Sequence, residues 1–195
     1  MVGKVHRTGD ILLDFGSGQG ELIRILKPVL QEGRILGLEL SEVGIRIAQH
    51  KTPDAEFNHI DLQAEKLGIP ELHDLGTLCI CSEVIEHLDH PHRFLNNVKC
   101  FMAPGGRLII TVPGGPMNAF YKSIGHRQHF TSRSLAALIE SAGLKIVKIH
   151  RAGFPFFNIF RMVATLRGEK AQQDAKGSPS FLVRAVFATF DFLFK

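Results

Sequence analysis

Two carboxylates and a histidine stand close together in this 195-residue chain: Glu83, Glu86 and His87. Their spacings of three and four residues would place all three on one face of a helical turn. Two more histidines, His126 and His129, follow further along the chain. A histidine can accept a proton near neutral pH, and carboxylates with imidazoles can hold a divalent ion. These residues therefore suggest removal of a proton from a hydroxyl, with or without a metal.

The two forms of this chemistry use the same residues differently. In the first, Glu83, Glu86 and His87 ligate Mg²⁺, Mn²⁺ or Zn²⁺, with His126 or His129 as a fourth ligand. In the second, the two carboxylates make hydrogen bonds at a helix start and a histidine acts as a metal-free base. His87, His126 and His129 are the candidate catalytic residues in either case.

A glycine-rich turn earlier in the chain indicates how these side chains would be positioned. The apolar run 11–15 reads as a buried strand, and Gly16, Gly18 and Gly20 follow it before a helix-like run over 21–30. A turn without Cβ atoms lets a ligand approach the backbone at the carboxyl end of a parallel strand. The dinucleotide fingerprint is G-x-G-x-x-G, and here the third glycine comes one residue early, which disfavours NAD.

Three further apolar runs predict strands that end near acidic residues: 34–40, 55–61 and 76–82. Glu39 lies 19 residues after Gly20, and an acid at about this spacing can accept hydrogen bonds from ribose hydroxyls. The alternative is a carboxylate that caps the helix predicted to start near Ser41.

Strands that alternate with helical runs predict an α/β fold with a doubly wound, mainly parallel sheet in the order 3-2-1-4-5. The remaining predicted elements are a helix, a turn, a fifth strand, a helix N-cap and a sixth strand: Pro91–Met102, Ala103–Gly106, Arg107–Pro113, Thr131 and Leu144–Arg151. We expect residues 1–153 to form this domain and residues 154–195 to form a helical tail.

Two motifs resemble those of a known enzyme family. Asp14-x-Gly16-x-Gly18-x-Gly20 resembles the first motif of the class I S-adenosylmethionine-dependent methyltransferases. Glu83-Val84-Ile85-Glu86-His87 resembles the Glu-x-x-Glu-His signature of the ubiquinone-biosynthesis O-methyltransferases, which small-RNA 3′-terminal 2′-O-methyltransferases also carry. The resemblance covers about residues 11–151.

This resemblance implies a Rossmann-like enzyme that binds S-adenosylmethionine. Glu39 would then bind the ribose, and Asp61 would bind the adenine amino group. His126 corresponds better than His129 to the histidine ligand of the RNA enzymes, so it is the preferred fourth metal ligand. The full predicted cofactor set follows the ends of the first four strands: Asp14, Gly16, Ser17, Gly18, Gly20, Glu39, Leu40, Asp61, Leu62 and Ser82.

The tail differs from the domain in composition. Residues 1–143 carry 14 Lys plus Arg against 16 Asp plus Glu, whereas residues 144–195 carry 9 against 3. Residues 154–195 also hold 9 of the 15 phenylalanines. Such an apolar, basic segment can pack on its own domain, line a hydrophobic substrate pocket, lie on a membrane surface or form a homodimer contact. The sequence leaves these alternatives open.

The leading functional prediction is O-methylation of a small or lipid-like acceptor by an S-adenosylmethionine-dependent methyltransferase. The alternatives are a metal-dependent RNA 3′-terminal 2′-O-methyltransferase and a cofactor-binding, non-catalytic partner subunit. Nucleic acid is disfavoured because the basic residues are mixed with phenylalanines. The polar start at residues 1–10, the three unpaired cysteines and the lack of a ~20-residue apolar run predict a cytoplasmic protein, with peripheral membrane contact left open.

Overall fold

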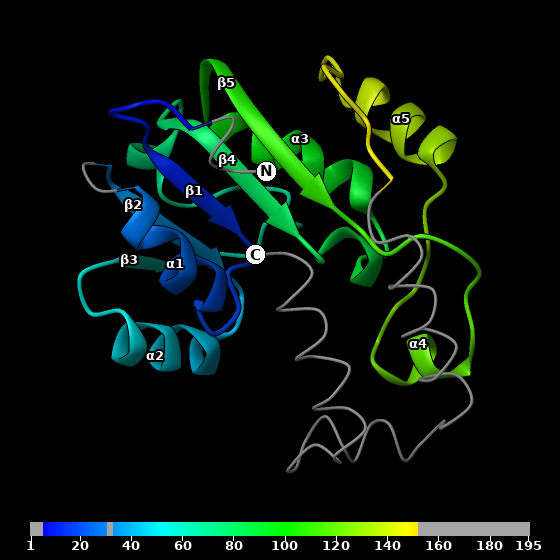
Figure 1. The fold of residues 1–195 in the computed structure, drawn as a ribbon, viewed down its shortest axis with the longest axis horizontal. Coiled ribbons are helices and arrows are strands. Elements are labelled where there is room, and N and C mark those ends of the chain that lie inside the picture. The colour runs from blue at the N-terminus through cyan, green and yellow to red at the C-terminus, as the bar shows by residue number, and fades with distance from the viewer. Residues whose placement is uncertain (1–5, 31–32, 152–195) are drawn as a thin grey trace.

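The computed structural model describes residues 6–30 and 33–151, which form a five-stranded sheet with helices on both faces (Figure 1). All four strand pairs are parallel, in the order β3-β2-β1-β4-β5, as predicted. The strands are β1 (Leu12–Phe15), β2 (Ile35–Glu39), β3 (Glu56–His59), β4 (Gly76–Ser82) and β5 (Met102–Thr111).

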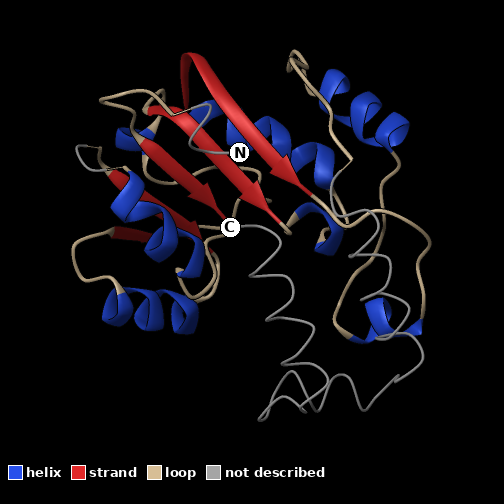
Figure 2. Cartoon of the chain, in the orientation of Figure 1, coloured by secondary structure: helices blue, strands red, loops and turns tan. Residues whose placement is uncertain are grey.

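The helices are α1 (Glu21–Leu26), α2 (Glu42–Lys51), α3 (Pro91–Phe101), α4 (Ala119–Ser123) and α5 (Ser132–Ser141). Helices α1, α2 and α3 connect strands and pack on the two faces of the sheet, whereas α4 and α5 follow β5 (Figure 2). Three short 3₁₀ turns accompany them: η2 (Lys27–Val29), η3 (Pro70–Leu72) and η4 (Ile85–His87).

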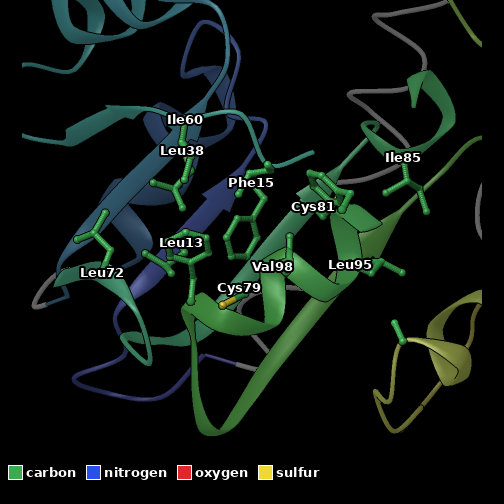
Figure 3. Packing of buried hydrophobic residues seen from close by; sticks show 14 of the residues in the cluster. Leu13, Phe15, Leu38, Ile60, Leu72, Cys79, Cys81, Ile85, Leu95 and Val98 are labelled. Atoms are coloured by element: carbon green, nitrogen blue, oxygen red, sulfur yellow. The ribbon is translucent and has the colours of Figure 1, made fainter. Parts of the chain in front are cut away.

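The sheet separates two apolar cores because successive side chains of a strand point to opposite faces. Leu12 of β1 packs in the cluster that includes Ile23 of α1 and Ala48 of α2. Its neighbour Leu13 packs in the other cluster, with Val98 of α3 (Figure 3). Because β1 and β4 are buried on both faces, their ends are held rigidly where the predicted motifs begin.

Local capping fixes where two of the helices start. Ser41 accepts a hydrogen bond from Gly44 N at 3.1 Å and caps α2. Thr131 and Ser134 form a reciprocal capping box at α5, which confirms the N-cap predicted at Thr131. Helix α3 begins at Pro91, a residue suited to a first helical position.

The end of the described chain differs from the prediction. The predicted turn 103–106 lies inside β5 as a register shift, because Gly76 pairs with Met102 while Leu78 pairs with Arg107. The predicted sixth strand over 144–151 is wrong for the described residues, where this segment is irregular. A strand needs a hydrogen-bonded neighbour, and no described strand pairs with this segment.

The predicted tail, residues 154–195, lies outside the described residues, so the division of the chain at residue 153 stays a prediction. Within the part that the structure describes, no helix has both the length and the apolar character needed to span a bilayer.

Candidate active site

The candidate site lies where the strand order reverses, between β1 and β4. In open parallel sheets, ligands bind outside the carboxyl ends of the strands at this reversal. The glycine turn follows β1, and the carboxylate–histidine segment follows β4. The two contact each other, because a Cβ added to Gly16 would lie 2.6 Å from Cγ2 of Val84. The two motifs that are 67 residues apart in the sequence therefore share one crevice.

Each glycine of the turn adopts the left-handed backbone region that favours glycine, with φ of 73°, 53° and 74° at Gly16, Gly18 and Gly20. Their surroundings differ. A Cβ at Gly20 would lie 2.9 Å from Cβ of Ala48 and 3.1 Å from Cζ of Phe57, whereas one at Gly18 would meet nothing within 4 Å. Gly20 therefore lets the turn pack on α2 and β3, and Gly18 leaves open space for a ligand.

Glu39, at the end of β2, joins this turn to the next helix. Its Oε2 accepts a hydrogen bond from Gly18 N at 2.8 Å, and its Oε1 accepts one from Ser41 N at 2.8 Å. Each carboxylate oxygen has two lone pairs, so both can still accept a hydrogen bond from a ribose hydroxyl. The ribose role and the role at the helix start are therefore compatible.

We expect Glu39→Ala to weaken S-adenosylmethionine binding by about 10-fold to 100-fold, the range that loss of hydrogen bonds to a charged group worth about 1.5–3 kcal/mol produces. Calorimetric titration of the cofactor measures this change. Glu42→Ala is the matched control, because Glu42 is an exposed carboxylate on the first turn of α2. An unchanged dissociation constant in Glu39→Ala would remove the ribose assignment.

Asp14 and Ser17 are the buried polar residues beside the glycine turn. Asp14 is 2% exposed, and burial, with the negative charge of Glu39, raises the pKa of its carboxyl to about 7. Ser17 is also buried, and its Oγ has no hydrogen-bond partner among the described residues. A buried, unpartnered hydroxyl is costly unless a ligand or a water satisfies it.

The remaining predicted cofactor residues have different surroundings. Leu40 is exposed directly after β2, where a bound ligand could reach it. Asp61 is exposed and accepts a hydrogen bond from Gln63 N at 2.7 Å. Leu62 is buried in the core on the α3 side of the sheet, so its side chain is a packing residue.

The carboxylate–histidine segment folds differently from the helical turn that its spacing suggested. The 3₁₀ turn η4 covers only Ile85–His87, and Glu83 precedes it with a left-handed φ of 56°. Glu83 therefore does not share a helical face with Glu86. Its Oε1 accepts a hydrogen bond from Thr111 Oγ1 at 3.1 Å, and Thr111 Oγ1 lies 2.9 Å from Ser82 Oγ. The single-face prediction is wrong because Glu83 has a left-handed backbone conformation and lies before the helical turn.

Glu86 is the most unusual residue of the site. It is 0% exposed, and its carboxylate oxygens make no hydrogen bond of good geometry among the described residues, although the Glu83 carboxyl lies close enough to interact with them. Burial, together with the nearby charge of Glu83, raises the pKa of its carboxyl to about 7. Its backbone carbonyl accepts a hydrogen bond from Arg127 N at 2.8 Å, which ties η4 to the segment that carries the other histidines.

The fold brings Glu86, His87 and His126 together. Each offers one ligand atom, and these three atoms lie within 4.8 Å of one another. Burial, followed by the charges of His87 and His129, lowers the pKa of His126 to about 4, so this imidazole is neutral at pH 7. His129 lies on the far side of His126, with Nε2 3.0 Å from His126 Nδ1. Three of the four predicted metal ligands are thus close together, and Glu83 is outside this group.

Sequence reasoning missed three contributors. Thr111 bonds both Ser82 and Glu83, and the carbonyls of Gly115 and Gly125 accept hydrogen bonds from site histidines. Thr111 could have been found, because it pairs with Ser82 at the ends of adjacent parallel strands. The glycine carbonyls carry no side-chain signal. Tyr121 also contributes, with its ring centroid 4.5 Å from that of His129.

A parallel sheet in this order, an Asp-x-Gly-x-Gly-x-Gly turn after β1 and a carboxylate at the end of β2 define the class I S-adenosylmethionine-dependent methyltransferases. Comparison with known families agrees with this class. The chain belongs to the family described as "Methyltransferase domain", whose sequence model matches residues 2–149.

Two curated relatives and one solved structure illustrate the similarity. The C-methyltransferase NovU of Streptomyces niveus is 28% identical over 74% of this chain. The ubiquinone biosynthesis O-methyltransferase of Coxiella burnetii is 26% identical over 75% of this chain and 68% of its own length. A putative methyltransferase from Bacillus halodurans has the same fold, with a TM-score of 0.63 at 18% identity over 89% of this chain and 81% of its own. The chain spans only 35% of the length of NovU.

Proposed function

We propose that this protein transfers the methyl group of S-adenosylmethionine to a hydroxyl oxygen of a small or lipid-like acceptor. The observation that carries this proposal is the cluster of Glu86, His87 and His126 beside the cofactor turn. A hydroxyl must lose a proton as its oxygen is methylated, and this cluster supplies groups that can accept one. A carbon or nitrogen acceptor that is already nucleophilic would not need the cluster.

The chain's own residues would divide the work as follows. Glu39 and the glycine turn hold the cofactor, whose sulfonium supplies an electrophilic methyl group. Methyl transfer is an in-line displacement, so the main task of the protein is to hold the acceptor oxygen close to that methyl carbon. His126 presents a neutral imidazole and His87 a second imidazole that can take the hydroxyl proton, and the Glu86 carboxylate stabilises the imidazolium that forms.

A divalent metal at the same cluster is the alternative form of this proposal, in which the imidazole lone pairs bind the ion and do not take the proton. The fit is supported by the donor set, one carboxylate with two unpartnered oxygens and two imidazoles, which suits Zn²⁺ or Mn²⁺ better than Mg²⁺. Glu86, His87 and His126 would hold the ion. It would lower the pKa of an acceptor hydroxyl bound to it.

We expect overnight dialysis against a chelator to lower the methyl-transfer rate by about 100-fold or more, within the range that metal activation of a hydroxyl can supply, and Mn²⁺ or Zn²⁺ to restore it. Titration of the chelated protein with Mn²⁺, followed by electron paramagnetic resonance, should show binding that His126→Ala weakens. Full activity in chelator would favour histidine acting alone as the base.

The names of the relatives point to two different acceptor atoms. The Coxiella relative is named an O-methyltransferase, whereas NovU is named a C-methyltransferase. RNA methylation loses support, because Glu83 of the predicted four-ligand set lies outside the cluster. A purely non-catalytic partner subunit would have no use for a buried, unpartnered carboxylate such as Glu86.

Methyl transfer from S-adenosylmethionine labelled with ¹³C in its methyl group tests the proposal. The acceptors offered are a catechol, a long-chain alkyl catechol, a 1,3-diketone and an RNA with a free 3′ end. We expect a new O-methyl carbon resonance with one of the catechols. A C-methyl resonance from the diketone alone, or transfer to RNA alone, would contradict oxygen methylation of a small acceptor.

A further inference from the structure

Two histidines of the candidate site, His87 of the cluster and the neighbouring His129, donate to glycine carbonyls in the segment between β5 and α5. His87 Nδ1 lies 3.1 Å from the carbonyl oxygen of Gly125, and His129 Nδ1 lies 2.9 Å from that of Gly115. A carbonyl oxygen can only accept a hydrogen bond, so each of these Nδ1 atoms carries a proton. In a neutral imidazole the other nitrogen is then an acceptor.

The position of the proton on His129 determines the position of the proton on His126. The Nε2 of His129 is an acceptor, and it lies 3.0 Å from His126 Nδ1. Nδ1 of His126 must therefore be the donor, which leaves Nε2 of His126 with a free lone pair. The chain of bonds runs from the Gly115 carbonyl through His129 to His126. At the other end of the same loop, the Gly125 carbonyl leaves Nε2 of His87 with a free lone pair.

We propose that His129 is a positioning residue that, with the carbonyls of Gly115 and Gly125, sets the tautomers of His126 and His87 so that each ring keeps a free lone pair on Nε2. This inference rests on the proposed function, in which these two rings take a proton or ligate a metal. It also reassigns His129, which the sequence presented as a direct catalytic candidate. Histidines that bind metals or act as bases commonly have their other N–H fixed in this way.

The backbone conformation at Gly115 and Gly125 orients the two carbonyls. Gly115 has φ of 86° and Gly125 has φ of 90°, conformations that other residues rarely adopt. A Cβ at Gly115 or Gly125 would therefore be strained even where space exists for it. The ring of Tyr121, at 5.1 Å from His126 and 4.5 Å from His129, holds both imidazoles in orientation.

The tautomers can be read directly by long-range ¹H–¹⁵N correlation spectra of the full chain labelled with ¹⁵N-histidine, recorded at pH 8. The chemical shifts of the two ring nitrogens distinguish a protonated Nδ1 from a protonated Nε2. We expect His87, His126 and His129 all to be protonated on Nδ1, with assignments made from His87→Gln and His126→Gln. A proton on Nε2 of His126 in the unaltered protein would overturn the proposal.

Two variants of His129 separate positioning from packing. His129→Gln keeps an amide oxygen that can accept from His126 and an amide N–H that can donate to Gly115, whereas His129→Phe keeps only the ring. In His129→Phe we expect the Nε2-protonated tautomer of His126 to appear and kcat to fall by about tenfold, as loss of such an outer partner typically produces. We expect His129→Gln to retain both the tautomer and most of the rate.

His92→Phe is the matched control, since His92 also bonds a backbone carbonyl, that of Ser141, outside the cluster. Loss of S-adenosylmethionine binding by His129→Phe would indicate that this variant does not fold. The spectra of the unaltered protein and of His129→Gln would then still test the tautomer of His126. An unchanged His126 tautomer in a folded His129→Phe would overturn the proposal. Because the spectra need no acceptor, the tautomers can be confirmed even if no tested hydroxyl is methylated, and the two failures are distinguishable.

Discussion

Glu86→Gln should lower kcat by about 100-fold or more, the range in which a catalytic acid, base or metal ligand contributes, while S-adenosylmethionine still binds. The carboxylate is fully buried beside His87 and His126, so a neutral amide of the same shape removes its charge and little else. A buried charge without a partner costs stability. We therefore also expect the midpoint of thermal unfolding to stay the same or to rise.

The opposite movement of rate and stability is what separates a functional carboxylate from a structural one. Glu140→Gln is the matched control, because Glu140 is an exposed carboxylate in α5, and we expect it to change neither quantity. If Glu86→Gln kept full activity, or lost stability together with activity, the assignment of Glu86 to the chemistry would fail.

Gly20→Ala should destabilise the fold by about 2–5 kcal/mol and abolish measurable cofactor binding. A left-handed backbone costs an alanine about 1–2 kcal/mol, and forcing a methyl group into a packed site costs about 1–3 kcal/mol. The methyl group would lie 2.9 Å from Ala48 Cβ. The free energy of unfolding in urea and a calorimetric titration of S-adenosylmethionine measure the two effects.

Gly18→Ala is the matched variant, because its φ of 53° is also left-handed but no atom lies within 4 Å of the added methyl group. Only the backbone cost of about 1–2 kcal/mol applies to the fold. We expect cofactor binding to weaken nonetheless, because the methyl group occupies the open side of the turn. Equal destabilisation by the two substitutions would show that packing at Gly20 is not what distinguishes these glycines.

Much of the scaffold could be predicted because it depends on local patterns. Buried parallel strands are short apolar runs, and β4 was predicted over the residues that it occupies, Gly76–Ser82. The strand order follows from alternating strands and helices with right-handed crossovers. The N-cap at Thr131 could also be predicted, because it depends on residues that are close together in the sequence.

The sequence predicted which residues belong to the candidate site better than it predicted how they are arranged. Spacing identified Glu86 and His87, but it could not show the left-handed backbone at Glu83 that turns this carboxylate toward Thr111. The contact between His126 and the β4 segment depends on a long loop whose path has no periodic signal. The hydrogen bonds that link the Gly115 carbonyl to His129 and His129 to His126 could not be predicted either, because a backbone carbonyl has no side-chain signal in the sequence.

Calorimetric titration with S-adenosylmethionine, with its demethylated product and with NAD tests the central claim most directly, because every site assignment depends on the ligand of the glycine turn. We expect S-adenosylmethionine and its product to bind, Gly18→Ala and Glu39→Ala to weaken the binding of both, and NAD not to bind. Binding of NAD without binding of either sulfur compound would contradict the assignment of the turn and the function built on it.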